Sequence, residues 1–250
     1  MKSLALHWKI LIGMLLGVVF GFVMLQVEGG TAFITAWIKP LGTIFVKLLK
    51  LIAVPLILAS LIKGISDLKD ISKFASIGIK TIVIYVLTTV IAISIGLTLV
   101  NIFNPGDGVS DATISKLTET YATNSNVQGK IAEATRQQQS GPLDFVVDMI
   151  PENAFSALSN NKLMLQVIFL AIFLGISLLL IGEKSAKPLK DVFDSLNDVV
   201  LKMVDLIMLT APYAVFALLA NVVVSSGDPE LLYALLFYAS VVVGGLLLMV

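Results

Sequence analysis

Six long apolar runs constrain the fold of this chain more than any other feature. A helix that crosses the ~30 Å hydrocarbon core of a bilayer needs about 20 mostly apolar residues. Runs of this kind occupy Ile10–Leu25, Leu41–Ile62, Thr81–Val100, Leu163–Ile181, Leu206–Val224 and Leu231–Val250. The sequence therefore predicts an all-α, polytopic membrane protein with six transmembrane helices.

The composition excludes several classes of function. Hydrophobic residues make up 57% of the chain and charged residues 14%, whereas a soluble domain is about a quarter charged. The formal net charge is zero, so the basic surface that nucleic-acid binding requires is absent. The chain has no cysteine and one histidine, His7, and no paired carboxylates or phosphate-binding loop. We expect a transporter that needs no cofactor, in preference to an enzyme or an ion channel.

The distribution of lysine predicts the orientation in the membrane. Lys2 and Lys9 precede the first run, and further lysines gather in the segments 63–80 and 183–202. The short segments on the opposite side carry only Lys39. Because cytoplasmic loops are enriched in Lys and Arg, we expect a cytoplasmic N-terminus in the inner or plasma membrane of the cell. The alternative, a cleaved signal peptide, lacks a small-residue cleavage site after the first run.

Two segments differ from the other parts of the chain, one in its polar composition and one in its lack of a polar flank. Residues 101–142 open with the turn signal Asn104-Pro105-Gly106 and continue with mostly polar residues, which predicts an extracytoplasmic loop, with a short helix near Lys130–Gln137. The last apolar run reaches Val250 with no polar flank. We expect from this that the chain is the N-terminal part of a longer protein.

Several positions within the apolar runs predict packing or local distortion. Gly13, Gly17 and Gly21 recur every fourth residue, which lets another helix or lipid approach closely. Lys47 and Lys50 lie on one face near the expected outer end of the second span, where long side chains reach the interface. Proline is expected to kink the second span or free a carbonyl at Pro55, and to kink the fifth span at Pro212. Apolar residues at helical spacing from Leu189 to Met203 predict an amphipathic helix at the cytoplasmic surface.

The third span carries a candidate cation site. Tyr85, Thr88 and Thr89 stand at positions i, i+3 and i+4, so three oxygen-bearing side chains share one helix face. Hydroxyl and carbonyl oxygens are suitable ligands for hard cations. The alternative is that threonine bonds back to the carbonyl four residues earlier, as is common in membrane helices.

Four stretches, in order, resemble the dicarboxylate/amino acid:cation symporters, the glutamate-transporter-like family. Residues 48–61 (Leu-Leu-Lys-Leu-Ile-Ala-Val-Pro-Leu-Ile-Leu-Ala-Ser-Leu) are similar to the family's second span. Residues 78–106 are similar to its third span and exit, residues 149–158 to the start of its fourth, and residues 211–218 to its fifth. The resemblance covers the chain except for the outer loop.

The resemblance implies a homotrimer in which each protomer transports independently by an elevator-like movement. Residues 1–62 and 143–224, with spans one, two, four and five, would form the trimerisation scaffold. Residues 77–100 and 231–250, with spans three and six, would belong to a moving transport domain. A Tyr-x-x-Thr-Ser/Thr pattern holds a sodium ion in the family, and here it corresponds to Tyr85, Thr88 and Thr89.

The family's substrate-binding elements do not occur in residues 1–250: neither the Ser-rich hairpin tip nor the Asn-Met-Asp-Gly-Thr stretch is present. The resemblance thus implies part of a symporter that couples Na+ (or H+) to uptake of an acidic or neutral amino acid or a C4-dicarboxylate. The expected partners are a small anionic or zwitterionic solute, membrane lipid and two further copies of the chain. The alternative is a non-transporting oligomeric membrane scaffold or a truncated gene product.

Overall fold

A computed structural model describes residues 5–68, 71–106, 143–226 and 229–249, together with scattered positions between 109 and 141. The regular elements within these ranges are all helices, which confirms the all-α class. The chain divides into two compact units. The first comprises residues 1–75 and 143–225 and contains the expected spans one, two, four and five. The second comprises residues 76–142 and 226–250 and contains spans three and six.

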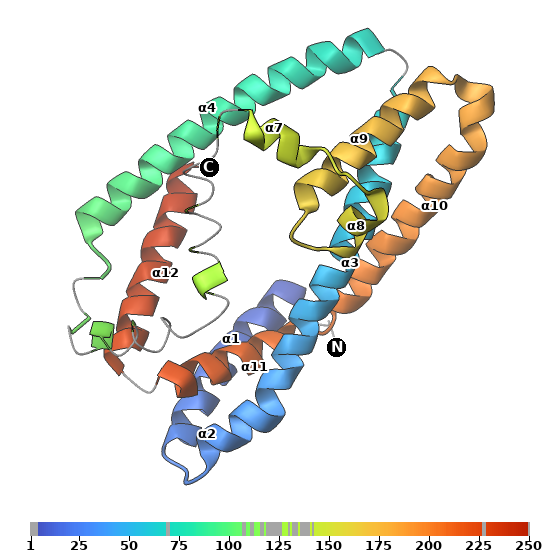
Figure 1. Ribbon diagram of the computed structural model, residues 1–250. Coiled ribbons are helices and arrows are strands. Elements are labelled where there is room, and N and C mark those ends of the chain that lie inside the picture. The colour runs from blue at the N-terminus through green and yellow to red at the C-terminus, as the bar shows by residue number, and fades with distance from the viewer. Residues whose placement is uncertain are drawn as a thin grey trace. The chain divides into compact units, whose positions relative to one another are not determined.

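The helices of the first unit follow the apolar runs but differ in their bounds (Figure 1). They are α1 (Leu6–Leu25), α2 (Gly30–Phe33), the π-helix η1 (Ile34–Ile38), α3 (Lys39–Ser66), α7 (Asp144–Met149), α8 (Ala154–Ser159), α9 (Met164–Leu180), α10 (Glu183–Met208) and α11 (Ala211–Ser226).

Three of the described helical stretches are long and apolar enough to cross a membrane alone: Leu6–Leu25, Gly30–Ser66 and Gly78–Phe103. The expected fifth span is the second half of a pair, α10 and α11, bent by 52° at the break before Pro212. The fourth and sixth expected spans are shorter apolar helices, Met164–Leu180 and Tyr233–Met249. The kink expected at Pro212 is confirmed, whereas α3 continues as one helix through Pro55.

The glycine stripe of α1 is a helix-packing surface. Gly13, Gly17 and Gly21 are all buried. A Cβ atom added at Gly13 would lie 2.5 Å from the carbonyl oxygen of Pro212, and one at Gly17 would lie 2.5 Å from that of Phe216. The absence of side chains therefore lets α1 run against the backbone of α11.

A second core joins α3, α9 and α10. Its buried members are Ile62, Ala171, Leu178 and Ala186. Polar contacts reinforce it, since the Ser60 hydroxyl donates to Asn197 Oδ1 over 2.9 Å and Lys63 Nζ lies 3.5 Å from Asp194 Oδ1. Asn197 is only 9% exposed, so its hydrogen bond lies inside the helix contact.

This packing corrects the expectation of a surface helix over Leu189–Met203. The segment 183–202, expected as a cytoplasmic loop, is most of α10, and Gly182 at φ 83° makes the turn that precedes it. The helix packs along α3 and α9 with the face that carries Ala186, Asn197 and Val200. An amphipathic pattern does not distinguish a helix on a bilayer surface from one packed on other helices.

The start of the second span is also corrected. Helical structure begins at Gly30, eleven residues before the expected start at Leu41, and passes through η1 into α3. Gly29 adopts φ 78°, which permits the tight turn between α1 and α2. Lys47 and Lys50 are both exposed on α3.

The second unit contains α4 (Ile71–Phe103), which begins in the first unit, and α12 (Pro229–Met249). The two helices contact each other where Leu99 approaches Gly245 and where the Phe103 and Phe237 rings meet edge to face, 6.5 Å apart. α4 extends past Val100 to Phe103, so the outer loop begins later than expected. Most of 104–142 lies outside the described residues, as does most of the expected helix near Lys130–Gln137, within which Ile131 and Thr135 are described and helical.

Candidate functional site

The three residues of the predicted cation site lie together on α4, in the second unit. Tyr85, Thr88 and Thr89 are all exposed, and Tyr85 is exposed to 73%. They lie within the long apolar stretch Gly78–Phe103, and no residue of its most apolar part is buried in the described structure. Helical periodicity thus places three oxygen-bearing side chains beside one another on an open face.

Thr88 makes the local hydrogen bonds that the alternative interpretation requires. Its hydroxyl donates toward the carbonyl oxygens of Ile84 and Tyr85, each at 3.0 Å. The same back-bonding occurs lower on α4, at Ser94 to Val90 and at Thr98 to Ser94, so it does not distinguish Thr88. A donating hydroxyl keeps its oxygen lone pairs, however, and these remain able to accept a hydrogen bond or ligate a cation.

The oxygens that this face itself offers to a cation are neutral hydroxyls and carbonyls. Across the part of the chain that the structure describes, no three or more His, Asp or Glu side chains gather in a way that could hold a metal ion. Hydroxyl and carbonyl oxygens bind hard cations without contributing full negative charge. The chemistry of this face therefore suits a weakly held monovalent ion better than a tightly bound structural metal.

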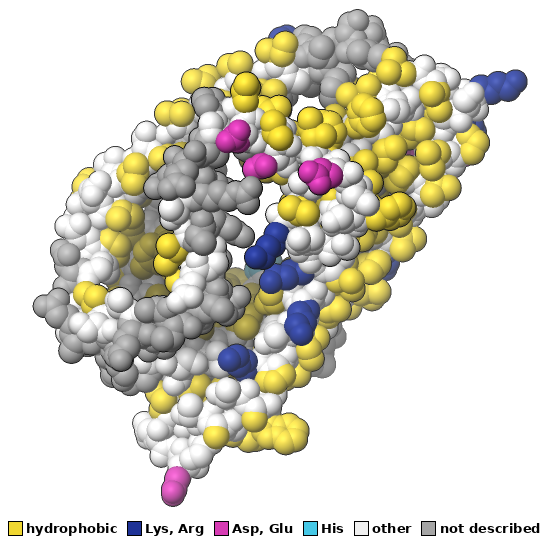
Figure 2. Space-filling view, viewed as in Figure 1, with side chains coloured by type: hydrophobic (Ala, Val, Ile, Leu, Met, Phe, Trp, Pro, Cys, Tyr) yellow, Lys and Arg dark blue, Asp and Glu magenta, His cyan; other side chains and the backbone are white. Residues whose placement is uncertain are grey.

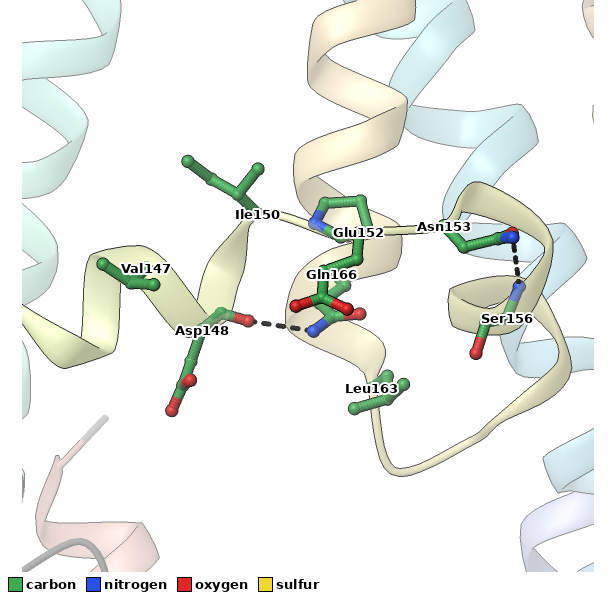
Figure 3. Close-up of a pocket in the computed structure, with 9 residues that line it drawn as sticks. Val147, Asp148, Ile150, Glu152, Asn153, Ser156, Leu163 and Gln166 are labelled. Carbon is green, nitrogen blue, oxygen red and sulfur yellow. Dashed lines mark hydrogen bonds between the residues drawn. The ribbon is translucent and has the colours of Figure 1, made fainter.

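A polar pocket of about 540 Å³ lies in the first unit, where the short helices α7 and α8 precede α9, the expected fourth span. Pro151 prevents α7 from continuing, and Asn153 starts α8 by accepting hydrogen bonds from the backbone N–H groups of Phe155 and Ser156, at 2.9 and 3.2 Å. Figure 3 shows the Gln166 amide reaching back to the main chain of Asp148, whose carbonyl oxygen it approaches to 3.1 Å. The pocket is thus built by two short helices folded back on the start of α9.

The pocket is acidic. Asp148 and Glu152 line it beside the neutral polar groups of Asn153, Ser156 and Gln166, and no cationic side chain is among the lining residues. Figure 2 shows acidic side chains gathered over α7 and the segment after it. Two carboxylates in one pocket repel an anion and attract a cation. This pocket is therefore unsuitable for a carboxylate-bearing solute.

Sequence reasoning did not identify this pocket. The available signal was Asp144, Asp148 and Glu152 at intervals of four residues, followed by a proline-interrupted helix pattern. Because a broken helix reverses direction, Gln166 comes from the next helix, and its proximity to Asp148 has no local signature in the sequence.

The model of the family described as "Sodium:dicarboxylate symporter family" matches residues 6–250. A "Proton/sodium-glutamate symport protein" from Bacillus caldotenax is 31% identical over 255 residues, covering 98% of this chain and 57% of the relative. The "Proton/glutamate-aspartate symporter" of Escherichia coli K12 is 29% identical, covering 96% of this chain and 56% of the relative.

Relatives that are named for a different substrate match the chain as well. A "C4-dicarboxylate transport protein" from Deinococcus deserti is 31% identical over 216 residues, covering 86% of this chain and 45% of that protein. The chain spans about half the length of the curated relatives that it matches. The resemblance seen in the four sequence stretches is therefore confirmed at the level of the family.

Proposed function

Since the chain belongs to the sodium:dicarboxylate symporter family, we propose that it supplies the N-terminal part of a secondary active symporter. That symporter couples the inward movement of Na+ or H+ to uptake of an acidic or neutral amino acid or a C4-dicarboxylate. The observation that carries the proposal is the family match over residues 6–250, supported by relatives named for glutamate, aspartate and C4-dicarboxylate transport. The protein is a multi-pass membrane protein, and we place its N-terminus in the cytoplasm because of its lysine distribution.

Tyr85, Thr88 and Thr89 form one wall of a site for the coupling cation in this proposal. Their exposure on α4 leaves the oxygens accessible to an ion and to further ligands from elsewhere in the protein. The Thr88 hydroxyl is oriented by its bonds to Ile84 and Tyr85, which lowers the entropy lost when its oxygen binds a cation. Coupling follows if cation and solute each bind more tightly in the presence of the other.

The two compact units correspond to two roles in the proposal. The first unit is the trimeric scaffold: backbone contact between α1 and α11 and the polar links between α3 and α10 give it internal rigidity. The second unit belongs to a transport domain that moves as an elevator relative to the scaffold. The acidic pocket around Asp148 and Glu152 repels a dicarboxylate, so the solute is bound elsewhere, near the cation wall on α4.

The cation site is tested by replacing Thr89 with valine in the intact transporter, reconstituted in liposomes. Thr89→Val keeps the shape of the side chain and removes one oxygen. We expect the Na+ concentration for half-maximal uptake to rise about tenfold, which corresponds to about 1.4 kcal/mol of lost cation binding. Thr98→Val is the matched control, because it makes the same substitution on the same helix at an exposed threonine outside the candidate site.

The results separate the site from the wider function. An unchanged Na+ dependence in Thr89→Val, or an equal change in Thr98→Val, would remove the case for this site while leaving symport itself intact. Uptake driven by a pH gradient without Na+, and unaffected by Thr89→Val, would identify H+ as the coupling ion.

A further inference from the structure

We propose that a groove between α1 and α11 binds one anionic phospholipid, with the headgroup at Lys9 and an acyl chain along the apolar walls. The groove has a volume of about 520 Å³ and lies wholly within the first unit. Its lining residues are Lys9, Ile12, Gly13 and Leu16 from α1, Leu209 from the bend after α10, and Pro212, Tyr213 and Phe216 from α11.

The shape of the groove follows from the glycine contact. Gly13 is buried at its base, where the backbones of α1 and α11 meet: an added Cβ atom would lie 2.5 Å from the carbonyl oxygen of Pro212. The larger side chains on either side of this contact cannot close over it, and they leave an open slot. Ile12, Leu16 and Leu209 keep 44%, 52% and 65% of their surface exposed.

The walls are suited to a hydrocarbon chain. Most of the lining residues are aliphatic or aromatic, and the slot opens on the outside of helices that belong to a multi-pass membrane protein. An acyl chain laid in the slot would gain van der Waals contact with these walls and not removal from water, because the surrounding lipid is itself apolar. A small polar solute would find few hydrogen-bonding groups there.

The charge at one end selects the headgroup. Of the eight lining residues, Lys9 alone is charged, and no carboxylate lines the groove. The successive contacts Gly13 to Pro212, Gly17 to Phe216 and Gly21 to Val223 show that α1 and α11 run parallel. Both helices thus begin at the Lys9 end, and the positive ends of their dipoles lie there.

Aromatic residues mark the same end as a membrane interface. Trp8 and Tyr213 are exposed, at 55% and 73%. Tryptophan and tyrosine are enriched at the level of lipid headgroups. A lysine at this level attracts an anionic lipid, with a preference of roughly fivefold over a zwitterionic one.

Trp8 is also a reporter next to the proposed site. The test uses the intact protein in bilayers of phosphatidylcholine, with Trp37 and every tryptophan outside residues 1–250 replaced by phenylalanine so that Trp8 is the only one. Brominated phosphatidylglycerol or brominated phosphatidylcholine is added in increasing proportion, and quenching of Trp8 fluorescence reports the lipid that occupies the groove. We expect about fivefold stronger relative binding of the phosphatidylglycerol, and its loss in Lys9→Gln.

Controls distinguish the possible occupants. Lys184→Gln removes an exposed lysine from α10 and should preserve the preference, as should addition of soluble glycerol phosphate. Leu16→Phe narrows the slot and should weaken quenching by both lipids.

Four results would overturn the proposal. Equal quenching by the two lipids, or a preference that survives Lys9→Gln, would show that Lys9 does not select the headgroup. Displacement by glycerol phosphate would identify a site for free phosphate. Quenching by neither lipid would show that protein covers the groove.

Discussion

The contact between α1 and α11 makes a sharp prediction about stability. Gly17→Ala adds one methyl group whose carbon would lie 2.5 Å from the carbonyl oxygen of Phe216 and 2.9 Å from its Cα atom. Because both are backbone atoms of a packed helix, neither can rotate away, and α1 must move. Overpacking of this kind costs typically about 1–3 kcal/mol.

A matched control isolates the clash from the intrinsic effect of alanine. Replacing glycine by alanine inside a helix is favourable by about 0.5–1 kcal/mol, wherever the glycine is located. Gly64 lies inside α3 in the same unit, and a Cβ atom there would meet nothing within 4 Å. Gly64→Ala should therefore show the favourable effect alone, and the difference between the two variants should equal the cost of the clash.

The assay is thermal unfolding of the purified protein in detergent, followed by the loss of the monodisperse peak in size-exclusion chromatography. For a chain of this size about 1 kcal/mol shifts the Tm by roughly 2–4 °C. We expect Gly17→Ala to unfold about 2–12 °C below Gly64→Ala, corresponding to the 1–3 kcal/mol above. Equal Tm values for the two variants would refute the direct backbone contact between α1 and α11.

Three further predictions concern other residues. Ser60→Ala removes the 2.9 Å hydrogen bond to the buried Asn197 and should lower the stability by about 1–3 kcal/mol in the same thermal assay. Lys63→Ala breaks a half-exposed ion pair with Asp194 and should lower it by less than about 1 kcal/mol. A larger loss for Lys63→Ala than for Ser60→Ala would be inconsistent with the burial of these groups. Asn153→Ala should lower the stability of the protein by about 1 kcal/mol, because α8 loses its N-cap. Asn153→Asp should keep the Tm at the original value, since a carboxylate also accepts hydrogen bonds from the Phe155 and Ser156 amides. A Tm for Asn153→Asp as low as that of Asn153→Ala would argue against a capping role. Since the chain contains no cysteine, Asn160→Cys should react with a membrane-impermeant maleimide added to whole cells and Lys184→Cys should not; labelling of Lys184→Cys alone would invert the proposed topology.

The elements that sequence patterns predicted well are those whose signal is local. Each apolar run is helical over most of its length, although the fifth is divided between α10 and α11. The four-residue spacing of Gly13, Gly17 and Gly21 predicted a close helix contact, because the small residue acts at its own position. The choice of partner was not local: nothing near Gly17 indicates that Phe216 lies opposite. Only the folded chain brings these positions together.

The errors have the same physical origin. The amphipathic pattern of α10 specifies that one face is buried, but the pattern is identical whether lipid headgroups or α3 and α9 cover that face. The sequence prediction began the second span at Leu41, whereas helical structure passes from η1 through Lys39 and Pro40 into α3, since proline is tolerated in the first turn of a helix. The acidic pocket was missed because its parts come from two short helices, α7 and α8, and from the start of α9, with a proline break between the first two.

The candidate cation site could be predicted from the sequence only in part. Spacing alone placed Tyr85, Thr88 and Thr89 on one face, and the structure leaves that face exposed. Its ligand geometry depends on residues that no local pattern on α4 specifies. The sequence therefore predicts three residues on one side of a cation site but does not predict which ion binds there.

The central claim is that the protein uses a cation gradient to concentrate an anionic or zwitterionic solute. The most direct measurement is uptake of radiolabelled glutamate, aspartate and succinate by the intact protein in liposomes under an inward Na+ or H+ gradient. We predict accumulation of at least one of these solutes that collapses when an ionophore dissipates the gradient. Absence of gradient-driven accumulation of all three, under either cation, would contradict the account.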